Sequence, residues 1–137
     1  MANSERKLAT VSANKKLVMY YFEKGRFTKS WETLKIHSKD VTDIIWNFDE
    51  TKVITCSKDK SIKMWNYEDG KMLAHIEDAH KDHPMALARF EGSRDFFSGG
   101  IDGAISCWDG VGNKVDRGFM KEVYSQFIED KIPGVLS

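Results

Sequence analysis

The stretch Val53-Ile-Thr-Cys-Ser-Lys-Asp-Lys-Ser-Ile-Lys-Met-Trp65 decides the fold of this chain. It contains an apolar run, a short polar turn and a second run in which polar and apolar residues alternate up to a tryptophan. This pattern is typical of a β-hairpin whose two strands face a core. The same pattern returns at residues 96–108, and a weaker copy stands upstream at residues 8–20. Repetition at this interval indicates a propeller or a solenoid, in which each copy is one stacked unit.

The spacing of the copies is regular. It is 43 residues for the pairs His37 and His80, Asp59 and Asp102, and Trp65 and Trp108. Tyr20 precedes Trp65 by 45 residues. A period of roughly 40–45 residues with a Trp-Asp ending is the signature of a WD40 blade, which has four strands. Trp108 is followed by Asp109, which gives the literal dipeptide, and Trp65 is followed by Asn66, its neutral variant.

On these residues the chain resembles the WD40-repeat family of β-propellers, over about residues 8–119. The resemblance implies an all-β fold of about three four-stranded antiparallel blades that form an incomplete ring. In this family a His before the first strand of a blade, a Ser or Thr on the second, an Asp in the next turn and a Trp on the third are linked by hydrogen bonds. Carried over by spacing, the two structural networks are His37, Thr55, Asp59 and Trp65, and His80, Ser98, Asp102 and Trp108.

Each network also contains the residue types of a nucleophilic triad. A catalytic site would normally occur once, whereas this set occurs once per blade and ends on a tryptophan that can donate to the hydroxyl. Because buried polar groups must find partners, a structural role explains the pattern better. We therefore expect a protein that is not an enzyme, with no catalytic residue and no cofactor.

The composition excludes several classes of function. The 137 residues include 21 basic and 21 acidic side chains and have no formal net charge. No basic excess is available to neutralise phosphates, so binding to nucleic acid or to a membrane surface is not expected. The hydrophobic content of 41% is enough for a globular core. No apolar run approaches the roughly 18 residues of a membrane span, and no secretory signal is expected at the N-terminus.

The metal-binding residue types do not form a site in the sequence. Cys56 and Cys107 fall on expected strands and do not form a CxxC pair, which argues against zinc and for a reduced, intracellular protein. His80 and His83 stand three residues apart, but a metal needs more ligands at fixed geometry. We expect a cytoplasmic rather than a nuclear location and no bound metal.

The repeat divides the chain into four segments. Residues 1–36 form a partial blade with its second, third and fourth strands, and residues 37–79 and 80–119 form two complete blades. The first blade lacks a matching His, so we expect it to be looser. Its fourth strand is predicted at 28–36, with Trp31 and Leu34 as apolar contacts, and Gly99 and Gly100 predict a bulge or a close backbone approach. The arm at 120–137 favours a helix, with the first strand of a fourth blade as the alternative.

WD40 rings usually close with about seven blades, which needs roughly 300 residues. The chain is therefore expected to be a fragment, a split subunit or one part of an oligomeric ring. We expect blade edges to be completed by another chain or a second copy through strand pairing.

Loops at one end of a propeller are the expected place for partner binding. By resemblance, the positions that point to this face are Asp40, Thr42, Lys58, His83, Met85 and Ile101. The alternative is that these are ordinary loop residues. The leading hypothesis is a non-catalytic scaffold module in an intracellular multiprotein assembly, and a homo-oligomer is one form of it. The alternative hypothesis is a subunit of a ribonucleoprotein or translation-related complex with weak RNA contact.

Overall fold

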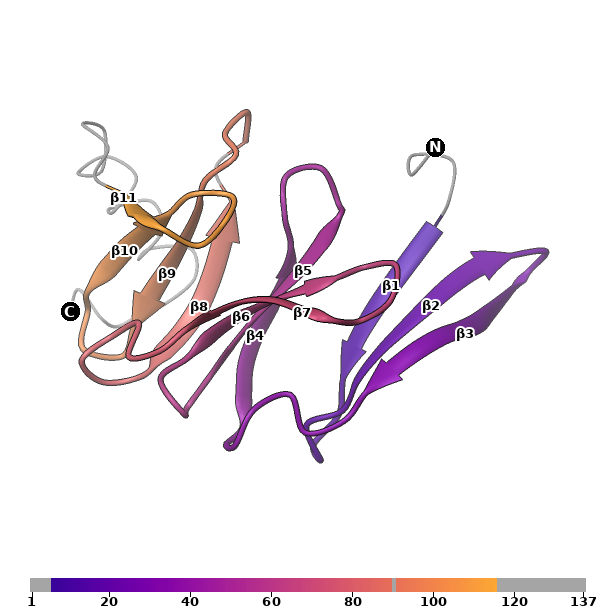
Figure 1. Cartoon of the computed structure of the whole chain (residues 1–137), viewed down its shortest axis with the longest axis horizontal. Helices are drawn as coiled ribbons and strands as arrows, with labels where there is room; N and C mark the ends of the chain where they lie inside the picture. The colour runs from indigo at the N-terminus through magenta and orange to yellow at the C-terminus, as the bar shows by residue number, and fades with distance from the viewer. Residues whose placement is uncertain (1–5, 90, 116–137) are drawn as a thin grey trace.

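The computed structural model describes residues 6–89 and 91–115, which form eleven β-strands in three antiparallel sheets. The sheets stand side by side in Figure 1, in the order of the chain from right to left. This arrangement confirms the predicted all-β fold of antiparallel blades in an unclosed array. The same residues include no helix with the length and apolar character that a membrane crossing requires.

The first sheet has the strand order β1 (Arg6–Val11), β2 (Leu17–Glu23) and β3 (Arg26–Thr33). Lys24 (φ 51°) and Gly25 (φ 80°) both adopt the left-handed conformation, as a two-residue type I′ hairpin turn requires. β3 ends at Thr33 and not at residue 36, because Lys35 has a φ of 50° and the N–H of Ile36 donates to the Lys15 carbonyl (3.1 Å).

The two apolar contacts predicted for this strand differ in outcome. Trp31 packs against the core between the first and second sheets, and its indole Nε1 donates to the Tyr67 carbonyl (2.7 Å). Leu34 is 63% exposed, so its predicted contact is wrong. It lies beyond the end of β3, where the chain has already turned away from the sheet.

The second and third sheets have four strands each. The second contains β4 (Val41–Trp46), β5 (Lys52–Ser57), β6 (Ile62–Asn66) and β7 (Met72–Ile76). The third contains β8 (Pro84–Arg89), β9 (Phe96–Gly100), β10 (Ile105–Trp108) and β11 (Lys114–Val115). Both have the same register, since Val53 lies opposite Trp65 and Phe96 lies opposite Trp108. The predicted strand at 116–119 and the arm at 120–137 lie outside the described residues.

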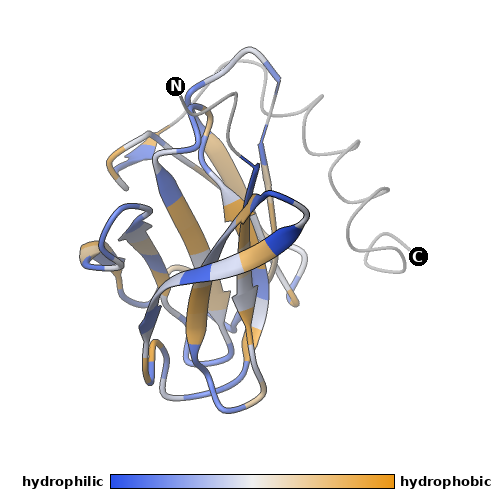
Figure 2. Cartoon of the chain, turned by 90° about the vertical axis from the view of Figure 1, so that its right-hand side faces the viewer, coloured by the Kyte–Doolittle hydropathy of each residue, from blue (hydrophilic) through white to orange (hydrophobic). Residues whose placement is uncertain are grey.

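Apolar side chains are buried between neighbouring sheets. Leu17 and Met19 of the first sheet pack against Val53 and Trp65 of the second. The opposite face of the second sheet packs against the third, through Ile54, Cys56, Ile62, Met64, Leu87, Phe96 and Trp108. Figure 2 shows the apolar segments on the strands and the hydrophilic ones mainly in the turns. The second sheet therefore has a buried face on each side.

Gly99 and Gly100 lie opposite a register shift, as predicted, but the extra residue belongs to the facing strand. The irregularity lies between Pro84 and Ala86 of β8. Gly100 also permits a close approach, because a Cβ on it would lie 2.6 Å from Asp102 Oδ1 and 2.8 Å from His80 Nδ1.

Candidate protein-binding rim

The first polar network links the second sheet to the loop before β4. Trp65 Nε1 donates to Thr55 Oγ1 (3.0 Å), and Thr55 Oγ1 lies 2.8 Å from His37 Nε2. His37 Nδ1 lies 3.0 Å from Asp59 Oδ2. Because the Thr55 oxygen accepts from the indole, its own proton donates to His37 Nε2, and the imidazole then donates from Nδ1 to the carboxylate. The structure thus brings His37, Thr55, Asp59 and Trp65 into one chain of hydrogen bonds.

The charges of this network follow from burial. Burial lowers the pKa of His37 and outweighs the attraction of the Asp59 carboxylate, so the imidazole is neutral at pH 7. Burial also disfavours the charged form of Asp59, but hydrogen bonds from the Ser61 hydroxyl and N–H, with smaller contributions from His37 and the Ser38 N–H, lower its pKa to about 2. The Asp59 carboxylate is therefore ionised at pH 7 beside a neutral imidazole.

The second network is similar but less complete. Trp108 Nε1 donates to Ser98 Oγ (2.8 Å), and Ser98 Oγ lies 2.7 Å from His80 Nε2. In the described residues, Asp102 Oδ1 accepts the N–H of Ala104 (3.1 Å) in place of an imidazole N–H. Its negative charge favours the protonated form of His80, against the larger effect of burial. Burial lowers the pKa of His80 as it does that of His37.

Two serines explain the difference between the networks. The Ser57 hydroxyl accepts from the Asp59 N–H (3.1 Å), and the Ser61 hydroxyl donates to Asp59 Oδ1 (2.6 Å). The positions 43 residues later are Gly100 and Ala104, which have no hydroxyl. Sequence reasoning missed Ser57 and Ser61, although serines flanking the turn Asp on both sides were a visible signal.

The two hydroxyls in these networks are in no position to attack a substrate. Thr55 and Ser98 are both 0% exposed, and each already contacts an indole and an imidazole. The Cys56 thiol is buried as well, and burial raises its pKa to about 12. Over residues 6–89 and 91–115, no group of three or more His, Cys, Asp or Glu side chains could hold a metal ion.

The candidate rim consists of the loops before β4 and β8 and the turns after β5 and β9. The six predicted residues fall into two equivalent pairs and two strand residues. The Lys58 N–H donates to the Asp40 carbonyl (2.9 Å), and the Ile101 N–H donates to the His83 carbonyl (3.1 Å). These four residues thus come together as loop–turn pairs in two neighbouring blades. Asp40, Lys58 and Ile101 are exposed, with Ile101 at 49%, and His83 is half-buried.

Thr42 on β4 and Met85 on β8 are half-buried and follow these loops. Thr42 Oγ1 donates to the Pro84 carbonyl (2.9 Å), which links the second sheet to the third. Asp43 strengthens this link, because its carboxylate accepts the N–H groups of Ile44 and Leu87, both at 2.8 Å. Sequence reasoning missed Asp43, since its partner is 44 residues away and no local pattern points to it.

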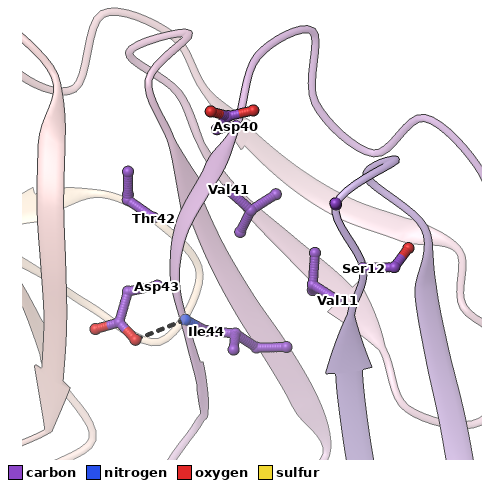
Figure 3. Close-up of a pocket in the computed structure, with 8 residues that line it drawn as sticks. Val11, Ser12, Asp40, Val41, Thr42, Asp43 and Ile44 are labelled. Atoms are coloured by element: carbon purple, nitrogen blue, oxygen red, sulfur yellow. Dashed lines mark hydrogen bonds between the residues drawn. The ribbon is translucent and has the colours of Figure 1, made fainter.

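A groove of about 480 Å³ opens beside Asp40, between the end of β1 and β4. Val41 and Ile44 point toward Val11 across it, whereas Thr42 and Asp43 leave β4 on the other side (Figure 3). Ser12 and Asp40 also line the groove, and Lys15 Nζ lies 3.9 Å from Asp40 Oδ1. The groove therefore combines apolar side chains with polar and charged ones.

Two four-stranded antiparallel sheets, each with a buried Trp–hydroxyl–His link, stack in a row with a three-stranded sheet and define the chain as a set of β-propeller blades. The family model "WD domain, G-beta repeat" matches residues 28–66. This match begins within β3 of one sheet and ends with β6 of the next, so the sequence repeat bridges two sheets.

The curated relatives and solved structures that match the chain also include WD-repeat proteins. The chain is 33% identical over 102 residues to the WD repeat-containing protein 55 homolog of Drosophila willistoni, which is 74% of this chain and 19% of that protein. It is 35% identical over 98 residues to the Denticleless protein homolog of Gallus gallus, covering 70% and 13%. The crystal structure of the RRP9 WD40 repeats matches 80% of this chain and 34% of its own, with a TM-score of 0.71 and 18% identity, which shows the fold alone.

The chain belongs to the WD40-repeat family, as the resemblance implied. It spans a fifth or less of the length of these curated relatives.

Proposed function

We propose that the chain is a non-catalytic scaffold module that binds other proteins within an intracellular multiprotein assembly. The observation that carries this proposal is the rim, where two equivalent loop–turn pairs present Asp40 and Lys58, and His83 and Ile101, on buried sheets. Side chains held on a rigid scaffold lose little freedom on binding, which favours affinity. The groove beside Asp40 adds a concave subsite.

The rim is tested by changing its exposed side chains and leaving the sheets intact. The tagged double variant Asp40→Lys, Ile101→Asp and the wild type are purified from cells, and the bound proteins are compared by quantitative mass spectrometry. We expect the variant to lose a defined set of proteins that Val111→Asp retains, because Val111 is exposed (64%) outside the rim. An identical set of bound proteins for all three chains would contradict the proposal.

The free edge of β1 supports association by strand addition. β1 pairs with β2, and the described residues place no strand on its other side, where β5 and β9 have β4 and β8. An extended segment can add to such an edge through main-chain hydrogen bonds. In the second sheet Trp46 lies opposite Val53, so the incoming strand would place an apolar residue opposite Leu8. The segment would come from another subunit or a second copy.

Light scattering after size-exclusion chromatography tests this association. We expect the purified chain to elute as a species heavier than the 15.7 kDa monomer. A stable and soluble monomer of that mass over a wide concentration range would contradict self-association. Binding of another subunit would then have to show in the purification described above.

A second candidate function is weak RNA contact within a ribonucleoprotein, and one observation favours it. Residues 6–33 contain seven Lys or Arg and two Asp or Glu, an excess of five positive charges in a chain without net charge. Fluorescence anisotropy with a labelled single-stranded RNA at roughly 50 and 200 mM salt tests this candidate, since phosphate contacts weaken steeply with salt. Binding that is absent at low salt, or that does not change with salt, would argue against it.

A further inference from the structure

A second pocket lies at the opposite end of the sheets from the rim. β4 and β8 begin at the rim loops and run toward the turns at 47–51 and 91–95, at the other end of the second and third sheets. These turns line a pocket of about 520 Å³. Its lining combines an aromatic ring, two guanidinium groups, a carboxylate and two small residues: Phe48, Arg89, Arg94, Glu91, Gly92 and Ser93.

Both guanidinium groups are held by the turn at 47–51. The Arg94 guanidinium lies over the Phe48 ring, with its Cζ 5.2 Å from the ring centroid. Arg89 Nη1 donates to the Asn47 carbonyl (3.3 Å). An arginine has five N–H donors, so each group keeps donors that these contacts do not use. The two planar groups are therefore partly oriented before any ligand binds.

Neither guanidinium is paired with a carboxylate in the described part of the chain. No carboxylate oxygen of the described residues lies within 4.0 Å of a nitrogen of Arg89 or Arg94. Asp49, next to Phe48 in the sequence, accepts instead from Thr51 Oγ1 (2.6 Å) and from Asn47 Nδ2 (2.8 Å) within its own turn. The pocket thus presents two positive charges that are available to an anion.

We propose that this pocket binds a phosphorylated serine or threonine side chain of a partner protein. A planar guanidinium matches phosphate oxygens with two parallel hydrogen bonds. The phosphate carries a charge of about −1.5 to −2 at pH 7, which balances two arginines, whereas a carboxylate balances one. The site goes beyond the proposed scaffold function, because it is separate from the rim and makes binding depend on modification of the partner.

A longer polyanion fits the pocket less well. Glu91 lines the pocket, and Asp49 and Glu50 follow Phe48 in the adjacent turn. All three acidic residues are exposed, so they repel the successive phosphates of an RNA strand and the headgroups of an anionic membrane. A single phosphate group meets this repulsion least. The residues on either side of the phosphorylated side chain are then expected to be neutral or basic.

A nuclear magnetic resonance titration of the ¹⁵N-labelled chain tests this site, with N-acetyl-O-phosphoserine amide as the probe. We expect saturable shifts of the backbone N–H signals of Phe48, Gly92, Ser93 and Arg94, and none of these shifts with N-acetylserine amide. N-acetylglutamate amide should bind more weakly, because it carries one negative charge. The absence of these shifts, equal affinity for the serine or glutamate probe, or larger shifts of the same signals with oligouridine would each overturn the proposal.

Two substitutions and a matched control locate the bound phosphate. Arg89→Gln and Arg94→Gln each remove one guanidinium, and we expect each to weaken probe binding by at least roughly 10-fold, as the loss of a charge-assisted hydrogen bond does. Phe48→Leu removes only the ring beneath Arg94 and should weaken binding by roughly 2- to 5-fold. Arg26→Gln removes the same charge from an exposed position at the start of β3 and should leave the affinity unchanged. The amide spectrum of each variant checks that it is folded, and an equal loss in Arg26→Gln would overturn the proposal.

The rim variant Asp40→Lys, Ile101→Asp distinguishes this site from the rim. We expect it to give the same shifts of the pocket signals as the wild type, because the rim lies at the other end of the sheets. If this variant loses the probe while Arg89→Gln and Arg94→Gln keep it, the phosphate binds at the rim and the assignment to the pocket is wrong. A failure at the pocket leaves the protein-binding test of the rim unaffected.

Discussion

The threonine hydroxyl at position 55 is the centre of the more complete of the two polar networks. Thr55 accepts from Trp65 and donates to His37, so one buried atom satisfies an indole and an imidazole. Without it, two buried polar groups would each lose a partner, and such a loss costs about 1–3 kcal/mol per group. The hydroxyl therefore contributes to stability mainly by preventing unpaired neighbours.

We expect Thr55→Val to lower the free energy of unfolding by about 2–4 kcal/mol, because both His37 Nε2 and Trp65 Nε1 lose their partner. Thr55→Ser keeps the hydroxyl and should cost only about 1 kcal/mol for the lost methyl group. Urea denaturation followed by tryptophan fluorescence measures both. Equal costs for the two variants would show that packing, and not the hydrogen bonds, sets the stability at this site.

The buried histidines should make the fold sensitive to acid. Burial lowers the pKa values of His37 and His80 below their ordinary value near 6.5, so the folded chain binds these protons less readily than the unfolded chain. Their contribution to stability is complete above pH 6.5 and is lost as the pH falls through the folded pKa values. We expect the urea midpoint to fall from pH 7.5 to pH 5.5, and His37→Gln to reduce that fall. A midpoint that rises on acidification would contradict the neutral assignment.

The hairpin between β9 and β10 depends on the absence of a side chain at Gly100. A Cβ there would meet Asp102 Oδ1 and His80 Nδ1 at less than 3 Å, so one of these groups would have to move. We expect Gly100→Ala to destabilise the fold by about 1–3 kcal/mol, as overpacked sites do. Gly110→Ala is the matched control, because the nearest atom to its Cβ would be 3.9 Å away. Calorimetric melting of both variants measures the difference, and equal melting temperatures would contradict it.

Lys7 on β1 and Lys52 on β5 each bridge two neighbouring sheets. Lys7→Met keeps the apolar stem but removes the contacts with Tyr67 and the Glu50 carbonyl, and we expect a loss of about 1 kcal/mol. Lys52→Met should have a similar cost, because it removes the bond to the Gly110 carbonyl. Lys24→Met, in an exposed turn, is the control in urea denaturation. If Lys24→Met lowers the free energy of unfolding as much as the other two substitutions, the contacts of Lys7 and Lys52 do not contribute specifically to stability.

The sequence sufficed to predict the blades because each repeat fixes its own pairing. Alternation within residues 53–65 sets which side chains face the core, and the position of Trp65 sets the register. The links between blades were harder to foresee. The Asp43 carboxylate accepts the Leu87 N–H, and the Lys7 ammonium lies over the Tyr67 ring. Both contacts form only because two sheets stack, and the periodicity within one strand does not predict them. The rim residues were expected from the resemblance alone, and their binding role stays a prediction.

The molecule as a whole should open from its first sheet. That sheet buries one face against Val53 and Trp65, whereas the second sheet is buried on both sides. Local opening costs least where the fewest apolar contacts are broken, so hydrogen exchange should be faster in residues 6–33 than in residues 52–66.

Met19→Ala, a fully buried change between the first two sheets, should accelerate exchange in residues 6–33 and leave the third sheet unaffected. Leu87→Ala is the reciprocal control, because its cluster lies between the second and third sheets. Hydrogen–deuterium exchange with mass spectrometry measures each segment. Uniform protection across all three sheets, or uniform acceleration in both variants, would mean that the blades unfold as one cooperative unit.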